Sequence, residues 1–431
     1  MKRSTLPGRP LEAINNSPVH SLAVRIMGMR SFVLFAIAAA ICVCSAAARP
    51  VAVPGVTATE IKLGSTVPLS GEAQAAGNLA RGADAYFKYI NAKGGVFGRR
   101  ITFKYLDDGY DPARGMSNTV RLVQQDQVFA MFSPLGTETN LAIRKFLNQQ
   151  HVPQLFVASG ATTFGRDYRQ YPWTIGYMPP YSEEGRLYGN YILAHVKQPR
   201  VAVLYQDDGY GRELLAGLRK GLGTRASAIV GQVGYKPTTA DVQPQIAQLK
   251  ASNANVLCIF AFGKFSQQAF TGMARAGWKP HTFVNGVAAS SALLSSVPQK
   301  AANGAVSVAF GKDPSSPMWK HDRGIRAFQQ ILKRYGGGGI GPRELGDGDY
   351  AAGMAVAYTV VDTLRKAGRN LTRQRVMRAA THLNERGNPF VLPGVVVRTS
   401  PTFRFPVTQV RLERWNAGSW RAFSRLVTLH P

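Results

Sequence analysis

Apolar residues follow two alternating patterns along this chain from residue 57 onward. Short apolar runs, typical of buried strands, occupy 61–69, 101–108, 128–134, 152–159 and 172–177. Between these runs, apolar residues recur at helical spacing, as Leu79, Ala83, Tyr86 and Ile90 do. Strands that alternate with helices predict a parallel sheet with helices on both faces.

The same pattern begins again after residue 180, which predicts a second sheet. Its strands are expected at 200–208, 229–235, 254–262, 281–287 and 304–310. Helical spacing returns around 325–335 and 354–364, and the segment 408–423 alternates as a hairpin. The glycine-rich stretch 336–341 is expected to form a surface loop. The sequence therefore predicts an α/β fold with two lobes.

The N-terminal segment has the order of residues that is typical of a secretory signal. Met29-Arg30 precedes the apolar run 31–44 and small residues that end at Ala48, where cleavage is expected. The run is shorter than the ~18 apolar residues that a membrane span needs. We assign 1–48 to this extension and expect a periplasmic protein. The alternatives for the first translated residue are Met1, Met27 and Met29.

The positive charge of the chain changes the list of possible partners. The 431 residues are 45% hydrophobic, which suits large cores, but 52 Lys and Arg face 24 Asp and Glu, giving a net charge of +28. Such an excess of basic residues is typical of proteins whose partners are nucleic acids, anionic membranes or acidic ligands. No run of five or six basic residues occurs and no aromatic residues interleave them. We expect a solvated basic surface and no nucleic-acid partner, although the sequence gives no reason for the charge.

Catalytic and metal-binding signatures are absent from the sequence. Neither H-E-x-x-H, G-x-S-x-G nor G-x-x-x-x-G-K-[ST] occurs, and the glycines at 336–341 follow a predicted helix, unlike a dinucleotide-binding loop. The seven His include no pair at i, i+4. After removal of the signal, Cys258 is the remaining cysteine, so no internal disulfide forms. We expect no enzyme, no metal and no cofactor.

Polar residues gather where predicted strands end, at the sheet edge that binds ligands in open α/β sheets. The pairs Asp107-Asp108 and Asp207-Asp208 fit either metal or acid–base chemistry, or turns and helix caps, and their glycine-rich surroundings favour turns. Two hydroxyl-rich loops suit an anion at a helix start, or simple helix capping. These loops contain Ser133, Pro134, Leu135, Gly136 and Thr137, and Ser159, Gly160, Ala161 and Thr162.

Several stretches in order resemble one family of binding proteins. They include IKLGSTVPLSG (61–71), NAKGGVFGRRI (91–101), FSPLGTETNLAI (132–143), HVPQLFVASGAT (151–162) and VAVLYQDDGYGRE (201–213). The chain resembles the type I periplasmic solute-binding proteins of ABC importers, the leucine/isoleucine/valine-binding family. The resemblance implies two Rossmann-like lobes joined by a hinge of three strands. Its implied parts are 57–179 with 310–405 for lobe 1, and 180–309 with a C-terminal hairpin at 406–431 for lobe 2.

The resemblance also implies which residues contact the ligand. Thr137 matches a hydroxyl that binds a carboxylate, Gly160 and Thr162 match a second carboxylate loop, and Tyr210 matches a tyrosine that covers the ligand. The cleft aromatic falls at Phe262 or Gly263, with Phe262 the better match. Lys264 beside it is either a positive partner or an exposed lysine. The expected binding set is completed by Ser70 in the opening loop, Asn285, and the remaining residues of the two hydroxyl-rich loops.

One departure from the family shapes the expected ligand. Amino-acid binders place an acid after the strand near 281–287, whereas this chain has Asn285 and Gly286 there. A buried ammonium without a partner costs several kcal/mol. We therefore expect a ligand with a carboxylate or amide and no cation, captured by a monomer and passed to the membrane permease of an ABC importer. A ligand-sensing receptor of the same fold is the alternative, and the solute itself is not identified.

Overall fold

The structure is a computed structural model that describes residues 53–431, so the predicted signal and the alternative start residues lie outside it. A parallel sheet of five strands in the order β2-β1-β3-β4-β5 forms the first half of the fold. Its strands are β1 Glu60–Val67, β2 Arg100–Asp107, β3 Ala130–Phe132, β4 Gln154–Val157 and β5 Thr174–Gly176. Each of these strands overlaps the apolar run that predicted it.

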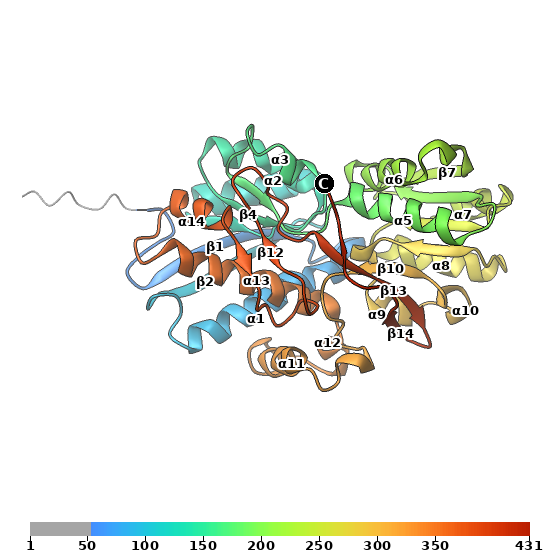
Figure 1. The fold of residues 1–431 in the computed structure, drawn as a ribbon. Helices are drawn as coiled ribbons and strands as arrows, with labels where there is room; N and C mark the ends of the chain where they lie inside the picture. The colour runs from blue at the N-terminus through green and yellow to red at the C-terminus, as the bar shows by residue number, and fades with distance from the viewer. Residues whose placement is uncertain (1–52) are drawn as a thin grey trace, which may run out of the picture. The chain divides into compact units, whose positions relative to one another are not determined.

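Helices from two distant parts of the chain surround this sheet, some packed on the sheet and others on those helices (Figure 1). They are α1 Asn78–Ala92, α2 Pro112–Gln124, α3 Thr137–Gln149, α4 Thr163–Arg166, α11 Arg323–Tyr335, α12 Pro342–Leu345, α13 Gly348–Ala367 and α14 Arg373–Ala380. Helices α1 and α13 pack backbone to backbone, because a Cβ at Gly353 would lie 2.0 Å from the Leu79 carbonyl oxygen. Phe87, Phe132 and Phe328 fill the shared core.

The second sheet combines a parallel part with an antiparallel edge. Its strands follow the order β14-β13-β10-β9-β8-β6-β7, and β15 pairs with β13. They are β6 Val201–Gln206, β7 Ile229–Tyr235, β8 Val256–Phe260, β9 His281–Val284, β10 Val306–Ala309, β13 Gln409–Asn416, β14 Ser419–Ala422 and β15 Val427–Thr428. Cys258 lies fully buried in β8 and behaves as a small apolar side chain.

Helices also cover the second sheet. They are α5 Tyr181–His195, α6 Gly209–Leu222, α7 Gln243–Ala251, α8 Lys264–Arg275, α9 Ser291–Ser295 and α10 Gln299–Ala302. Glycines let α5 and α6 approach closely, since a Cβ at Gly217 would lie 2.1 Å from the Ser182 carbonyl oxygen. The chain passes between the two sheets after β5, after β10 and before β13.

The two-lobed α/β fold predicted from the sequence is confirmed, and so is the loop at 336–341. The sequence did not predict the short pair β11 Asn384–Glu385 and β12 Val397–Arg398, the short helices, or the 3-10 turn Gly71–Gly77. These elements are too short for a periodic pattern to emerge. Within 53–431, no helix combines the length and the apolar character that crossing a membrane requires.

Candidate functional site

A cleft of about 1150 Å³ lies where carboxyl ends of strands from both sheets face each other. The first sheet contributes Thr137, which follows β3, and the second contributes Tyr210, Phe262 and Gly286, which follow β6, β8 and β9. Open α/β sheets bind ligands at this edge, because loops there leave the sheet and backbone groups are free. The cleft is therefore the candidate binding site.

The start of α3 forms one wall of the cleft. Gly136 precedes the helix with a φ of +98°, a left-handed conformation that favours glycine. The Asn140 side chain fixes this turn by donating to the carbonyl oxygens of Pro134, at 2.8 Å, and Gly136, at 2.7 Å. The Thr137 hydroxyl lies 2.8 Å from the Ser159 hydroxyl. A hydroxyl next to free helical N–H groups is placed to accept an anionic or polar ligand atom.

Aromatic side chains form the opposite wall. Phe262 stacks on Tyr110 with ring centroids 5.4 Å apart and meets Tyr210 edge to face at 6.3 Å. The Tyr210 hydroxyl lies 3.1 Å from both the Ala261 carbonyl oxygen and Asn285 Oδ1. Burial raises the pKa of Tyr210 well above its ordinary value, so its hydroxyl stays protonated. Sequence analysis missed Tyr110, because it follows a turn in the first lobe, whereas Tyr210 and Phe262 lie in the second lobe.

A buried carboxylate, that of Glu184, also borders the cleft. Glu184 lies in the first turn of α5, and its side chain accepts hydrogen bonds from the Tyr188 hydroxyl, the Gly286 N–H and the Asn285 side chain. Burial raises the pKa of Glu184 to about 7, against the lowering effect of these donors. Sequence analysis missed this residue because acids in a first helical turn are common partners of the helix dipole.

Lys264 is only partly exposed, which argues against the exposed lysine that the sequence allowed, and its role as a partner of the ligand stays a prediction. Its ammonium forms an ion pair with Glu72 at 2.5 Å, although the side chain does line the cleft. The preceding Gly263, with a φ of +57°, lets the two loops touch, since a Cβ there would lie 2.5 Å from the Glu72 carbonyl oxygen. Lys264 thus joins the two lobes by an ion pair.

The predicted binding residues separate into two groups. Those that line the cleft are Leu135, Gly136, Thr137, Tyr210, Phe262 and Lys264. Those that do not are Ser70, Ser133, Pro134, Ser159, Gly160, Ala161, Thr162 and Asn285. The donors of Thr162 already have a partner, because its N–H and hydroxyl both donate to the Glu213 carboxylate. This loop does bind a carboxylate, but one that the protein itself supplies.

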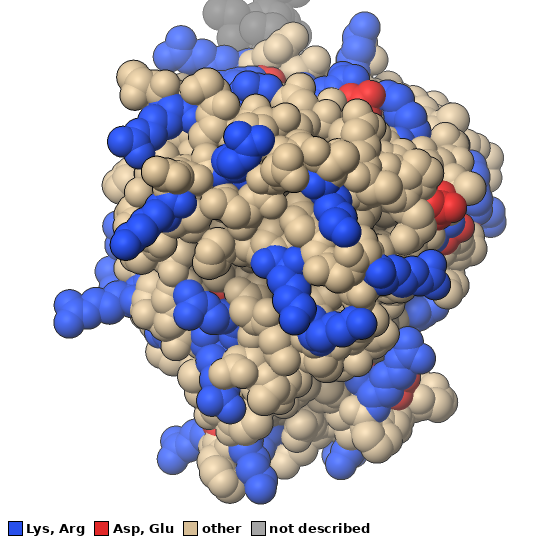
Figure 2. Space-filling model, turned by 90° about the vertical axis from the view of Figure 1, so that its right-hand side faces the viewer, with Lys and Arg blue, Asp and Glu red and all other residues tan. Residues whose placement is uncertain are grey.

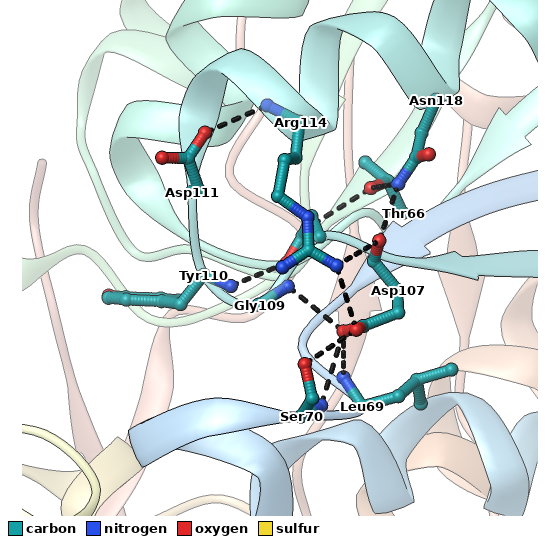
Figure 3. Close-up of polar contacts among 10 residues, drawn as sticks. Thr66, Leu69, Ser70, Asp107, Gly109, Tyr110, Asp111, Arg114 and Asn118 are labelled. Carbon is teal, nitrogen blue, oxygen red and sulfur yellow. Dashed lines mark hydrogen bonds and ion pairs between the residues drawn. The ribbon is translucent and has the colours of Figure 1, made fainter.

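Asp107 organises the loop that opens the first lobe (Figure 3). Its carboxylate accepts from the Leu69 N–H at 2.8 Å, the Ser70 hydroxyl at 2.5 Å, the Gly109 N–H at 2.9 Å and Arg114 Nη2 at 2.9 Å. Burial alone would raise the pKa of Asp107, but these hydrogen bonds hold it well below its usual range. Ser70 therefore shapes the loop from outside the cleft.

The turn and capping interpretation of the Asp pairs is confirmed. Asp208 caps α6 by accepting from the N–H groups of Tyr210 and Gly211. Asp207 pairs with Arg212 and Lys236, and its pKa is lowered by hydrogen bonds from Lys236 and then Arg212. The described part of the chain holds no group of three His, Cys, Asp or Glu side chains placed to bind a metal ion.

Basic side chains are scattered over the outer face of the second lobe. Figure 2 shows Lys and Arg spread across this face with few acids between them. They come from several helices, with Lys220 in α6, Lys250 in α7 and Arg275 in α8 all exposed.

Comparison with known proteins places these features in a family. A family model described as "Periplasmic binding protein" matches residues 60–419. The Leu/Ile/Val-binding protein homolog 2 of Brucella abortus is 27% identical over 355 residues, covering 81% of this chain and 88% of that protein.

Two solved structures share the fold. One is a branched-chain amino acid ABC transporter protein from Thermus thermophilus with bound valine, with a TM-score of 0.76, 17% identity, and coverage of 86% of this chain and 97% of that chain. The other is a solute-binding protein from R. palustris in complex with benzoate, with a TM-score of 0.70, 16% identity, and the same coverage of 86% and 97%.

Proposed function

Because the chain belongs to the type I, leucine/isoleucine/valine-binding group of the periplasmic binding protein family, we propose that it captures a small solute and delivers it to an ABC-type importer. The family consists of substrate-binding proteins, which are not enzymes. The observation that carries the proposal is the cleft of about 1150 Å³, to which Thr137 comes from one lobe and Tyr210 from the other.

Capture by closure follows from contacts that only a closed cleft provides. The lobes, 57–179 with 310–405 and 180–309 with 406–431, move about the three chain crossings, which act as the hinge. A solute that touches Thr137 and Phe262 together is held more tightly when the lobes are shut. Its differential affinity shifts the population toward the closed form, which the permease then recognises.

The solute places a polar group at the start of α3. The Thr137 hydroxyl and the first N–H groups of this helix favour a carboxylate or an amide oxygen there. Valine and benzoate, the ligands of the two solved neighbours, both carry a carboxylate. Tyr110, Tyr210 and Phe262 provide the apolar contacts to the body of the solute.

The protein works as a monomer outside the cytoplasm, after export and cleavage near residue 48. It meets a membrane permease there, and no nucleic acid takes part. A sensing role would use the same cleft but a different partner.

The decisive experiment has two stages. Native mass spectrometry of the purified protein should show a retained small molecule that gentle unfolding releases unchanged. The loaded protein should then raise the ATPase rate of its reconstituted permease, whereas a sensor would bind solute without this effect. Chemical conversion of the solute by the protein, or the absence of any retained molecule after exposure to candidate solutes, would contradict capture.

A further inference from the structure

Helix α11 has a stripe of positive charge along its outer face. Its inner face is buried and holds Gly324, Ile325, Phe328, Ile331 and Leu332. The exposed positions fall at helical spacing on the other side, and they are Arg323, Arg326, Gln330, Lys333 and Arg334. No acid lies among them. We call the four bases of this face, Arg323, Arg326, Lys333 and Arg334, the α11 stripe.

The α11 stripe has no counterion within the described part of the chain. Among residues 53–431, every ion pair is formed by other bases. The adjacent acid, Asp322, is occupied, because its Oδ1 lies 2.8 Å from the Lys312 ammonium and accepts from the Ile325 N–H at 3.0 Å. The stripe therefore keeps its attraction for an anion that comes from outside.

Interactions within the helix do not explain the whole stripe. Arg323 and Arg326 lie among the first four residues of α11, and the helix dipole disfavours cations at this end. They are also like charges three residues apart, which repel each other on a helix surface. Lys333 and Arg334 occupy the last turn, where the dipole favours them. The first half of the stripe thus weakens the helix, and a negative surface outside the protein would offset that effect.

An exposed apolar side chain precedes the stripe. Met318 is 53% exposed, the highest value among the three large apolar side chains that are exposed within residues 53–431. It lies in the 3-10 turn Pro317–Trp319, shortly before Arg323 along the chain, and exposed Lys320 follows it. A lipid headgroup layer attracts bases and also accepts an apolar side chain, whereas a soluble polyanion attracts the bases alone. The combination favours a membrane surface over an acidic polymer.

The α11 stripe lies apart from the candidate binding site. None of its four residues lines the cleft. Figure 1 shows α11 at the lower edge of the first lobe, whereas α5, α6, α7 and α8 lie in the other lobe. A contact through α11 therefore uses a different surface from solute capture.

We propose that the α11 stripe docks the protein on an anionic phospholipid surface, with Met318 entering the headgroup layer. The attraction acts within a Debye length, about 8 Å at physiological salt. The excess of 52 Lys and Arg over 24 acids steers the whole protein toward the same surface. Docking does not depend on solute capture. Its consequence does, because a docked carrier has a raised concentration beside the permease to which the proposed function assigns it.

Sedimentation with vesicles tests the docking. The vesicles are phosphatidylcholine alone, or phosphatidylcholine with about one-third phosphatidylglycerol, in about 0.1 M salt, where the Debye length is ~10 Å. Wild type should bind the anionic vesicles and not the neutral ones. The stripe variant combines Arg323→Gln, Arg326→Gln, Lys333→Gln and Arg334→Gln. Its affinity for anionic vesicles should fall about tenfold or more, because one base at an anionic surface contributes about fivefold.

A matched variant removes the same charge from the second lobe. It combines Lys220→Gln, Arg225→Gln, Arg275→Gln and Lys300→Gln, which are exposed bases outside any ion pair of the described chain. Vesicle affinity should stay within about threefold of wild type, since these bases lie in the other lobe, beyond a Debye length of ~10 Å from a surface that contacts α11. Thermal unfolding shows that both variants are folded.

Soluble polyglutamate separates a membrane from an acidic polymer as the partner. Met318→Ser should lower vesicle affinity about threefold and leave polyglutamate binding unchanged, because the apolar contact forms in lipid alone. Wild type that ignores anionic vesicles, or an equal loss in the stripe and matched variants, would overturn docking through α11. A stripe variant that binds vesicles as wild type does but loses polyglutamate would overturn it as well. Retention of a solute in native mass spectrometry is independent of all these results, so capture stands or fails separately.

Discussion

The ammonium of Lys264 lies 2.5 Å from the carboxylate of Glu72, and this ion pair joins the start of α8 to the 3-10 turn after β1. A second polar contact is a hydrogen bond, in which the Gly209 N–H at the start of α6 donates to Glu138 Oε1 of α3 at 2.7 Å. The lobes are therefore held together by polar contacts from the protein itself.

Breaking the Lys264 pair should move the population toward the open form. For Lys264→Met we expect a solute affinity that is lower by up to about fivefold, because a partly exposed ion pair contributes ~0–1 kcal/mol. The side chains are 26% and 55% exposed, so the effect should shrink in high salt. Small-angle scattering or interlobe fluorescence transfer measures the opening. Lys88→Met, which breaks an ion pair with Asp84 inside α1, is the control and should leave the lobe distance unchanged.

Removing the charge of Asp107 should destabilise the opening loop of the first lobe. Hydrogen bonds to a charged group contribute about 1.5–3 kcal/mol each in favourable cases, and the partial exposure of Asp107 places Asp107→Asn near the lower end. We expect a loss of about 1–2 kcal/mol in urea unfolding at pH 7. Asp111→Asn is the control, because asparagine caps a helix as well as aspartate does and Asp111 caps α2.

The pKa of Asp107 also sets a direction for acid unfolding. Because its folded pKa lies below the unfolded value of about 3.9, its stabilising effect is complete above that value and is lost as the pH falls below it. The difference in stability between wild type and Asp107→Asn should therefore narrow from pH 5 to pH 2. A difference that widened toward low pH would contradict this assignment.

Sequence analysis predicted part of the candidate site and missed the rest. The loop of Thr137 was found because it follows a buried apolar run, and strand ends mark the binding edge of a sheet. Tyr210 and Phe262 came from the resemblance to the family. Glu184 and Tyr110 were missed, because each meets its partners across distances in the sequence that leave no periodic signal. Tyr110 meets Phe262 of the other lobe, and Glu184 meets the loop at Asn285.

The sequence also did not reveal which side chains of the protein itself bind the polar groups of a candidate ligand loop. The loop with Thr162 has the residues of an anion site, and the structure fills that site with Glu213 of α6. The sequence allowed Lys264 to be a ligand partner or an exposed lysine, and it did not reveal the ion pair with Glu72. Local residues therefore indicate which chemistry a loop offers, whereas the three-dimensional contacts decide which group uses it.

Buried acids make the folded protein less stable as the pH rises toward 8. Burial raises the pKa of Glu385 to about 7, and its Oε2 is buried with no hydrogen-bond partner. Because the folded pKa exceeds the unfolded value of about 4.3, the folded state binds more protons between these values and stability falls as pH rises. The decline is complete once the pH passes about 7.

Glu385→Gln should remove part of this decline. Its free energy of unfolding should change less between pH 5 and pH 8 than that of wild type, by on the order of 1–3 kcal/mol, as urea titrations at each pH measure. Glu413 has a pKa raised to about 7 by burial and should leave a residual decline of the same sign in the variant. A pH profile parallel to that of wild type would show that Glu385 stays ionised in the folded protein.

The hydroxyl of Thr137 should act on the carboxylate end of a solute alone. Thr137→Val keeps the shape and removes the contact of 2.8 Å with the Ser159 hydroxyl, which still accepts from the Ala161 N–H. We expect L-leucine affinity to fall about tenfold, because a lost hydrogen bond to a charged group amounts to ~1.5–3 kcal/mol. The affinity for 3-methylbutylamine, which has no carboxylate, should stay within about twofold of wild type. Thr119→Val in α2 is the control, since the Thr119 hydroxyl donates to the Gly115 carbonyl oxygen and does not line the cleft. An equal loss for both probes would show that Thr137 supports the fold of the α3 turn and does not contact the carboxylate.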